Sequence, residues 1–329
     1  MRRRDILALF GCLPIAWPLA AGAQQSERTR RLGILYGADA DDEVSQARHA
    51  AFLKVLQDRG WTSGRNVQIE TRWAAGDADR TSKFATELAA LAPDVIFATG
   101  TPTVAALLRA TRTVAIVFAT VPDPVGAGFV DSLAKPGGNA TGFMNYDYSL
   151  AAKWLELLKQ IAPATTRAAV LRDPAATSGI GQWAAIQTVA SSLGIELTPI
   201  NVTDMGEIER SLAAFARAPN GGMIVTGSFL TAVHRKPIVA LAARYKLPAV
   251  YFGRYIVEEG GLLSYGPDYT DGYRKAADYV DRILRGAKPG ELPVQAPSKY
   301  ELVINARTAK ALRLEISPTL LATADDVIE

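Results

Sequence analysis

Polar, glycine-containing loops follow several apolar runs of this chain, and they hold the residues best suited to bind a small molecule. The sharpest such loop, TGTPT at 99–103, follows the apolar run 94–99. Thr101 is suited to cap a helix, and Pro102 fits the first helical position. The N–H groups at a helix start can hold a carboxylate or another anion. The loop therefore indicates an anion site, although helix capping without a ligand accounts for the same residues.

A second loop carries a carboxylate that could bind a cation. Asp123 lies between Pro122 and Pro124, so the backbone on both sides of it is restricted. A fixed carboxylate beside the helix start at residue 101 would suit a zwitterion, with Asp123 holding its ammonium group. The alternative is an aspartate that only stabilises a turn.

Loops of the same kind recur in the second half of the chain, at 173–178, 226–229 and 252–254. In parallel sheets, loops at the carboxyl ends of strands surround the ligand. Aromatic residues in equivalent positions could line an apolar wall, although each also suits an ordinary core. These aromatics are Tyr36, Phe229 and Phe252.

Catalytic and metal-binding patterns are missing from the sequence. His49 and His234 stand alone, without an H-E-x-x-H or H-x-H pattern, so a histidine metal site or a Ser-His-Asp triad needs long-range assembly. There is no phosphate-binding P-loop, no G-x-G-x-x-G after a strand and no G-x-S-x-G. Glu258 and Glu259 precede a Gly-Gly turn and suit a solvated surface. We therefore expect no catalytic residue, metal or cofactor, and capture of a ligand rather than its conversion.

Apolar runs and amphipathic stretches alternate along the chain, which predicts parallel sheets covered by helices on both faces. The pattern stops in the Gly- and Pro-rich segment 122–139 and then restarts, so we predict an α/β protein of two doubly wound parallel-sheet domains. The strong helix at 273–285 follows the second series and could return to the first domain, which would make a hinge of several chain crossings. Strands are expected at 31–36, 66–73, 94–99, 114–119, 141–144, 167–172, 196–202, 222–226, 249–253 and 299–305, and helices at 45–59, 81–91, 102–109, 149–161, 183–193, 205–217, 231–245 and 273–285.

Residues 1–23 are typical of a secretory signal peptide. A start with three arginines precedes a short apolar run, and Ala-Gly-Ala at 21–23 suits signal-peptidase cleavage. Cys12, the only cysteine, lies in this leader, where the bulky Phe10 makes a poor lipoprotein signal. We therefore expect export to the periplasm, with a lipid anchor at Cys12 as the alternative.

The charge balance gives no indication of nucleic-acid binding. The chain has 36 Lys and Arg, 33 Asp and Glu, and a net charge of +3. Because the leader contributes three arginines and one aspartate, the remaining chain is close to neutral.

Several segments together resemble the ABC-transporter substrate-binding proteins of the tryptophan/tyrosine type, which have a type I periplasmic-binding fold. The resemblance covers nearly all of the chain after the leader. Its segments are 94–102, VPDPVG at 121–126, KPGGNATG at 135–142, GGLLSYGP at 260–267, YVDRILRGAKP at 279–289, ELVIN at 301–305 and ADDVIE at 324–329.

This resemblance implies a ligand held between two lobes that close about a hinge, and its delivery to a membrane permease. It implies that Thr101, Thr103 and Asp123 contribute to the cleft, and that Tyr265 lies near a domain crossing. The loop 173–179 lacks an Asn found in many relatives, which counts against an aromatic amino acid as the ligand. From the loops and the resemblance, we predict these ligand-binding residues: Tyr36, Gly100, Thr101, Thr103, Asp123, Ser178, Ser228, Phe252 and Tyr265.

We expect the N-terminal lobe to comprise 30–145 with 268–292, and the C-terminal lobe 146–267 with 293–329. The predicted function is capture of a small organic solute, an amino acid or a related carboxylate, as the extracytoplasmic component of an ABC importer. The expected partners are that solute and an inner-membrane ABC permease, with no nucleic acid, and the protein is expected to be a monomer. The alternatives are a periplasmic ligand sensor that feeds a signalling kinase, and an exported enzyme on the same scaffold.

Overall fold

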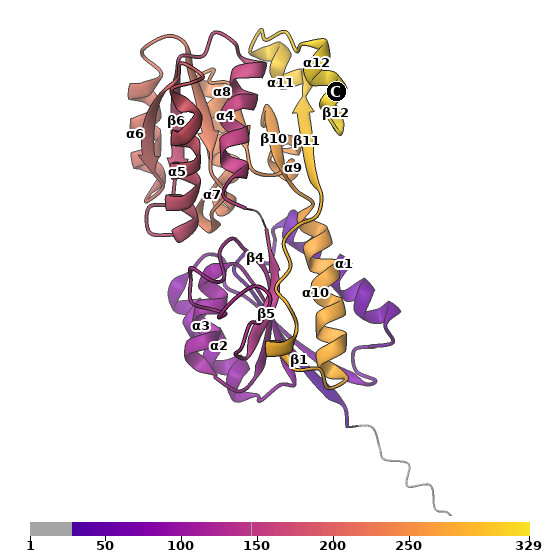
Figure 1. The fold of residues 1–329 in the computed structure, drawn as a ribbon. Coiled ribbons are helices and arrows are strands. Elements are labelled where there is room, and N and C mark those ends of the chain that lie inside the picture. The colour runs from indigo at the N-terminus through magenta and orange to yellow at the C-terminus, as the bar shows by residue number, and fades with distance from the viewer. Residues whose placement is uncertain (1–27, 146) are drawn as a thin grey trace, which may run out of the picture.

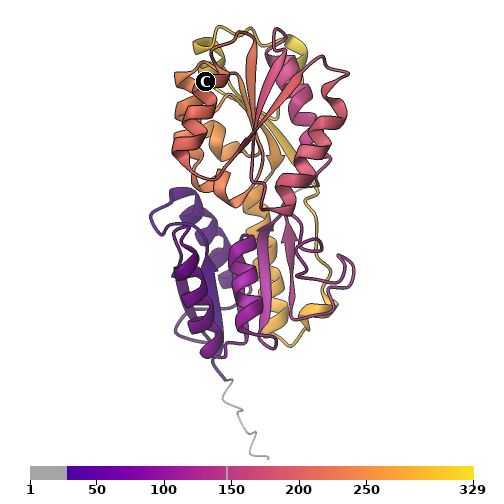
Figure 2. The ribbon, with the colours of Figure 1, turned by 90° about the vertical axis from the view of Figure 1, so that its left-hand side faces the viewer.

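The protein folds into two lobes joined by several chain segments, as Figure 1 and Figure 2 show. The structure, a computed structural model, describes residues 28–145 and 147–329. The predicted leader and Cys12 lie outside the described residues. Each lobe is an α/β unit built on its own sheet, so the predicted fold class is confirmed.

The N-terminal lobe contains a five-stranded sheet in the order β2-β1-β3-β4-β5, in which all strand pairs are parallel. Its strands are β1 (Arg30–Tyr36), β2 (Val67–Trp73), β3 (Val95–Thr99), β4 (Ala115–Val121) and β5 (Ala140–Met144), and its helices are α1 (Glu43–Asp58), α2 (Ala78–Ala90), α3 (Thr101–Ala110) and α10 (Tyr269–Leu284). Helices α1 and α10 cover one face and α2 and α3 the other (Figure 1). Because both faces are covered, β3 is buried along its whole length and its sequence, VIFAT, is almost entirely apolar.

The C-terminal lobe contains a seven-stranded sheet in the order β12-β11-β10-β9-β8-β6-β7. Its strands are β6 (Arg167–Arg172), β7 (Glu196–Asn201), β8 (Gly221–Val225), β9 (Ala249–Tyr251), β10 (Leu263–Pro267), β11 (Tyr300–Asn305) and β12 (Asp326–Ile328). Its helices are α4 (Leu150–Ile161), α5 (Thr177–Ala190), α6 (Met205–Phe215), α7 (Phe229–Val233), α8 (Arg235–Arg244), α9 (Arg254–Glu258), α11 (Ala306–Ala311) and α12 (Pro318–Thr323). Helices α4 and α5 pack together on one face of the sheet, and α6 and α8 lie on the other (Figure 2). The pairs are parallel except for β10 with β11, which is antiparallel.

Several elements depart from the sequence prediction. Helix α5 begins at Thr177, not at residue 183, although Gly179 and Gly181 weaken its first turns. Both glycines lie where a side chain would clash, since a Cβ on Gly179 would lie 1.8 Å from the backbone oxygen of Asp173. The predicted helix at 231–245 is divided at His234 into α7 and α8. Strand β10 and helix α9 were not predicted.

Three segments cross between the lobes, at the ends of β5, β10 and a short 3₁₀ helix, η1 (Pro289–Glu291). The first two crossings lie near the predicted boundaries at 145 and 267. The third lies later than residue 292, because Val294 packs in the core of the N-terminal lobe. The backbone N–H of Gln295 also donates to the oxygen of Gly142, at 3.0 Å, and so continues the edge of the same lobe.

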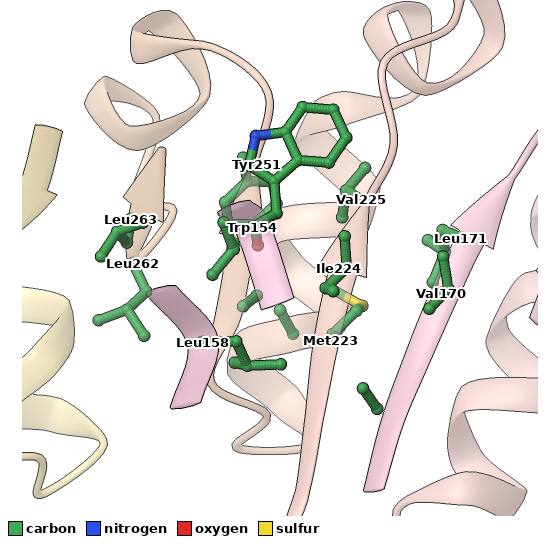
Figure 3. Packing of buried hydrophobic residues seen from close by; sticks show 14 of the residues in the cluster. Trp154, Leu158, Val170, Leu171, Met223, Ile224, Val225, Tyr251, Leu262 and Leu263 are labelled. Atoms are coloured by element: carbon green, nitrogen blue, oxygen red, sulfur yellow. The ribbon is translucent and has the colours of Figure 1, made fainter. Parts of the chain in front are cut away.

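Trp154 of α4 lies at the centre of the C-terminal lobe. It is fully buried, and its Nε1 donates to the backbone oxygen of Tyr265 at 2.7 Å. Figure 3 shows Trp154 and Leu158 among the apolar side chains of β8 and its neighbours. The Tyr265 ring lies 6.0 Å from that of Tyr300. The contact through Trp154 therefore ties α4, which follows the first crossing, to β10, which precedes the second.

Tyr36 belongs to the core of the N-terminal lobe and is fully buried. Its ring stacks on Trp73 at 4.1 Å, and its hydroxyl lies 2.9 Å from Nδ1 of His49. Burial raises the pKa of Tyr36, so the phenol keeps its proton and can donate it to a neutral imidazole. Burial also lowers the pKa of His49 from its ordinary value of 6.5.

We expect His49 to make the protein less stable in mild acid. Because the folded state lowers its pKa, the unfolded chain binds a proton more readily, and stability present above about pH 6.5 falls as the pH decreases below that value. His49→Gln should therefore reduce the difference in melting temperature between about pH 7.5 and about pH 5.5. An unchanged difference in thermal unfolding experiments would show that His49 does not contribute.

Candidate ligand-binding site between the lobes

A cavity of about 340 Å³ lies between the two lobes. It is bordered by loops that follow β1, β3 and β4 in one lobe and β6, β8 and β9 in the other, together with the first turns of α1, α9 and α10. The carboxyl ends of the strands of both sheets therefore face the same space, as expected for doubly wound folds. Its volume is in the range of small-molecule sites, about 300–1,000 Å³.

The structure brings part of the predicted site to this cavity. Five of the predicted residues line it: Gly100, Thr101, Ser178, Ser228 and Phe252. The other four do not line it: Tyr36, Thr103, Asp123 and Tyr265. Tyr36 is held in the N-terminal core and Tyr265 lies against Tyr300 in β11, so neither ring faces the gap between the lobes.

Two helix starts, one from each lobe, face the cavity. Helix α3 begins at Thr101 and not after it, so the prediction that Thr101 is the N-cap is wrong. Gly100 is the N-cap, with a φ of 87° that favours glycine. Among the described residues, no side chain caps α3, and none caps α5, whose first turn includes Ser178. Both helix starts therefore present backbone N–H groups to the cavity, where they can hold an anion.

Thr103 and Asp123 use their polar atoms within the N-terminal lobe or at the hinge. The Thr103 hydroxyl donates to the backbone oxygens of Thr99 and Gly100, both at 2.8 Å. One oxygen of Asp123 accepts from the N–H of Gly126 and the other from the hydroxyl of Tyr148, both at 2.7 Å. The loop after β4 thus folds back into a turn, which directs the Asp123 carboxylate to the hinge segment.

Arg48 of α1 supplies a positive charge to the cavity wall. Its guanidinium carbon lies 4.6 Å from the ring centre of Tyr255 and 5.1 Å from that of Tyr269. It forms no ion pair with any carboxylate in the described part of the chain. Burial raises the pKa of Tyr255 to about 12, so this ring remains a neutral phenol beside the cation. The hydroxyl of Tyr273 also forms a hydrogen bond with Arg48. A guanidinium held by aromatic side chains in this way keeps its remaining N–H donors for a ligand carboxylate.

Asp173 supplies a negative charge from the opposite lobe. Its Oδ1 accepts a hydrogen bond from the N–H of Ala175 at 3.0 Å. Like Arg48, it lines the cavity and has no ion-pair partner among residues 28–145 and 147–329. Asn145, at the first crossing, adds a buried Oδ1 for which the described residues provide no hydrogen-bond partner. The cavity therefore offers groups for both ends of a zwitterion.

Neither Arg48 nor Asp173 was among the predicted site residues. Arg48 lies within a helical pattern, and the sequence gives no sign that this face of α1 meets the second lobe. Gln182 was also missed, although it positions the cavity wall. It is fully buried, its Oε1 accepts from the N–H of Gly227 at 2.8 Å, and its Nε2 donates to the oxygens of Ser178 and Gly227, both at 2.9 Å.

The lobes touch each other beside the cavity. Phe229 of the C-terminal lobe packs on the backbone of Gly37, where an added Cβ would lie 2.6 Å from its ring. The same ring lies close to Gly100. Small residues of the N-terminal lobe thus let an aromatic side chain of the other lobe approach closely, and the two lobes are closed around the cavity.

The described residues contain neither a candidate metal cluster nor a candidate membrane-spanning helix. No group of three or more His, Cys, Asp or Glu side chains in that part of the chain could hold a metal ion. None of its helices is long and apolar enough to cross a membrane.

Comparison with known proteins finds relatives that match most of this chain. A curated tyrosine-binding protein of Clostridioides difficile (strain R20291) is 29% identical over 265 residues, which cover 80% of this chain and 76% of that protein. A conserved domain protein of Vibrio cholerae has a TM-score of 0.84 at 28% identity and covers 91% of this chain and 100% of that one.

Two other solved structures differ in their ligand state. An ABC domain in complex with L-Trp from Streptococcus pneumonia has a TM-score of 0.84 at 24% identity, over 91% of this chain and 100% of that one. A ligand-free, open substrate-binding protein from Clostridium difficile has a TM-score of 0.68 at 26% identity, over 91% of this chain and 99% of that one. The lower score of the open structure agrees with the closed lobes seen here. The family model for ABC transporter substrate-binding proteins matches residues 41–328, and the chain belongs to this family.

Proposed function

We propose that this protein captures an amino acid with an aromatic or large apolar side chain and delivers it to an ABC permease. The observation that carries the proposal is the cavity between the lobes, with Arg48 on one side and Asp173 on the other. The α-carboxylate would bind at Arg48 and the start of α3, and the α-ammonium group at Asp173 and Asn145. The side chain would pack against Phe229, Phe252 and the tyrosines, as a site for a small apolar molecule requires.

The binding mechanism that we propose is closure about the three crossings. A solute that contacts both lobes does so only when they are closed, so its binding shifts the population toward the closed form. The Asn missing from 173–179 counts against an aromatic solute, but the relatives named for tyrosine and L-Trp and the aromatic cavity wall support one. We propose no chemical conversion of the solute, in agreement with the solute-binding relatives.

The cellular setting is part of the same proposal. A leader at 1–23 would direct the chain to the periplasm, where the closed and loaded form would meet the permease as a monomer. A sensor that feeds a kinase would use the same closure, so the release of solute to a permease is the distinguishing step.

Native mass spectrometry of protein purified from the periplasm tests this proposal. We expect a bound molecule with the mass of an amino acid, which is released unchanged on unfolding. A bound molecule without an amine and a carboxylate, or conversion of added amino acids into products, would contradict it.

A further inference from the structure

A buried cluster of charges joins the lobes at the wall of the cavity, where Asp42 and Arg235 both line it. Contacts within the C-terminal lobe hold the part of the cluster that belongs to that lobe. Arg235 of α8 has a side chain that is only 10% exposed. Its Nε donates to Oε1 of Glu259 at 3.0 Å, and its Nη1 donates to the oxygen of Ala232 at 3.1 Å. The ring of Tyr255 lies 5.7 Å away. The guanidinium is therefore fixed before the other lobe contributes anything.

The other terminal nitrogen of Arg235, Nη2, forms an ion pair with Oδ1 of Asp42, which belongs to the N-terminal lobe. Asp42 is also the N-cap of α1, because its Oδ2 accepts from the N–H of Ser45 at 2.9 Å. Burial raises the pKa of Asp42, but hydrogen bonds from Ser45 and Arg235 outweigh burial and hold it below its ordinary range. Asp42 is therefore a carboxylate that both starts α1 and faces the second lobe.

Helix α1, which begins next to Asp42, also places Arg48 against the C-terminal lobe. Arg48 lies on α1, and its guanidinium covers Tyr255, which also lies next to Arg235. The ring of Tyr255 is thus shared by a guanidinium from each lobe. Asp42, Arg48, Arg235 and Glu259 together carry no net charge, so closure buries a neutral set of groups.

We propose that Asp42, Arg235 and Glu259 form a latch that holds the lobes closed without solute and positions Arg48 for it. This inference concerns closure itself and does not depend on the identity of the solute. When the lobes separate, Arg235 retains its ion pair with Glu259, and Asp42 retains its hydrogen bond from the N–H of Ser45. Neither charge is therefore left buried without a partner. A buried ion pair adds little net stability, because desolvation offsets much of the attraction. The latch therefore favours the closed form only modestly and permits opening.

The variant Asp42→Asn tests the ion pair with Arg235 without removing the N-cap of α1. Asparagine caps helices as well as aspartate does, so the bond to Ser45 remains while the charge that attracts Arg235 is lost. Glu209→Gln is the matched control, because Glu209 forms an exposed ion pair with Arg244 inside the C-terminal lobe. Both variants remove one carboxylate and keep the size of the side chain.

The closed fraction can be measured by electron–electron double resonance with one spin label on each lobe. Lys83 of α2 and Gln187 of α5 are exposed and can be replaced by cysteine, with Cys12→Ser to remove the natural one. After bound solute is removed by unfolding and refolding, we expect a closed population in the otherwise unchanged protein. Asp42→Asn should lower the ratio of closed to open form by roughly tenfold, as expected for a charged hydrogen bond, and Glu209→Gln should not change it.

Three results would overturn the latch. They are a solute-free protein with no closed population, an Asp42→Asn variant with the original distance distribution, and additive effects of Asp42→Asn and Arg235→Gln. Residues that act as a pair give non-additive effects, so the double variant should be no more open than the single variants. If the closed fraction responds as expected but no amino acid binds, the latch stands and the proposed solute is wrong.

Discussion

Arg48→Gln is expected to weaken the binding of L-tyrosine or L-tryptophan by roughly 10- to 100-fold without unfolding the protein. A hydrogen bond to a charged group contributes about 1.5–3 kcal/mol, and loss of the guanidinium would leave the solute carboxylate to the helix starts alone. Arg48 is half-buried and forms no ion pair within the described chain, so its removal leaves no protein carboxylate unpaired. Isothermal titration calorimetry measures the effect.

The matched control for Arg48 is Arg244→Gln. Arg244 also lies over a tyrosine ring, at 5.5 Å from that of Tyr245, but it is exposed and does not line the cavity. This variant should bind with unchanged affinity. Amines that lack the carboxylate, such as tyramine or tryptamine, should bind equally to the original protein and to Arg48→Gln. An Arg48→Gln variant with the original affinity for both amino acids would remove Arg48 from the site.

Trp154→Ala is expected to lower the free energy of unfolding by about 3–5 kcal/mol, the usual cost of removing a buried tryptophan. The side chain is fully buried in the C-terminal core, and it holds the oxygen of Tyr265 through a hydrogen bond of 2.7 Å. The loss would combine an internal cavity with a buried carbonyl that lacks this donor. Chemical denaturation followed by circular dichroism measures the change.

Trp154→Phe separates these two contributions. It keeps an aromatic ring in the core but cannot donate to Tyr265, so we expect a smaller loss than with alanine. Trp183→Ala is a useful comparison, because Trp183 lies at the edge of the same core and is only partly buried. Equal losses for Trp154→Ala and Trp183→Ala would contradict the central position of Trp154.

Much of the architecture was accessible from the sequence because central strands such as β3 and β4 are continuous apolar runs between helical stretches. Strand β6 was predicted at its observed bounds, and most other elements within a few residues. The prediction is wrong where the conformation that the local sequence favours differs from the one that tertiary contacts impose. The first turns of α5 contain glycines that favour a loop, but the Tyr148 ring packs where a Cβ of Gly181 would lie. That contact depends on the hinge, which no local pattern reveals.

The site was predicted less completely, for a physical reason. Loop residues such as Gly100 and Ser228 can be predicted because they follow a strand, and both line the cavity. The sequence gives a weaker signal for the charged residues that face the cavity. Arg48 has the sequence context of an ordinary surface helix, and only the closed arrangement brings it to Tyr255. Asp123 had the more distinctive context between two prolines, yet its carboxylate is used by Gly126 and Tyr148.

One amino acid is expected to bind between the lobes, and calorimetric titration of solute-free protein measures this binding. We expect saturable binding of L-tyrosine or L-tryptophan with one molecule per chain. We also expect Ala175→Trp to lose that binding, because Ala175 is exposed and lines the cavity, so the indole would occupy the site without disturbing the core. Absence of binding by any common amino acid, or equal binding by the original protein and Ala175→Trp, would contradict it.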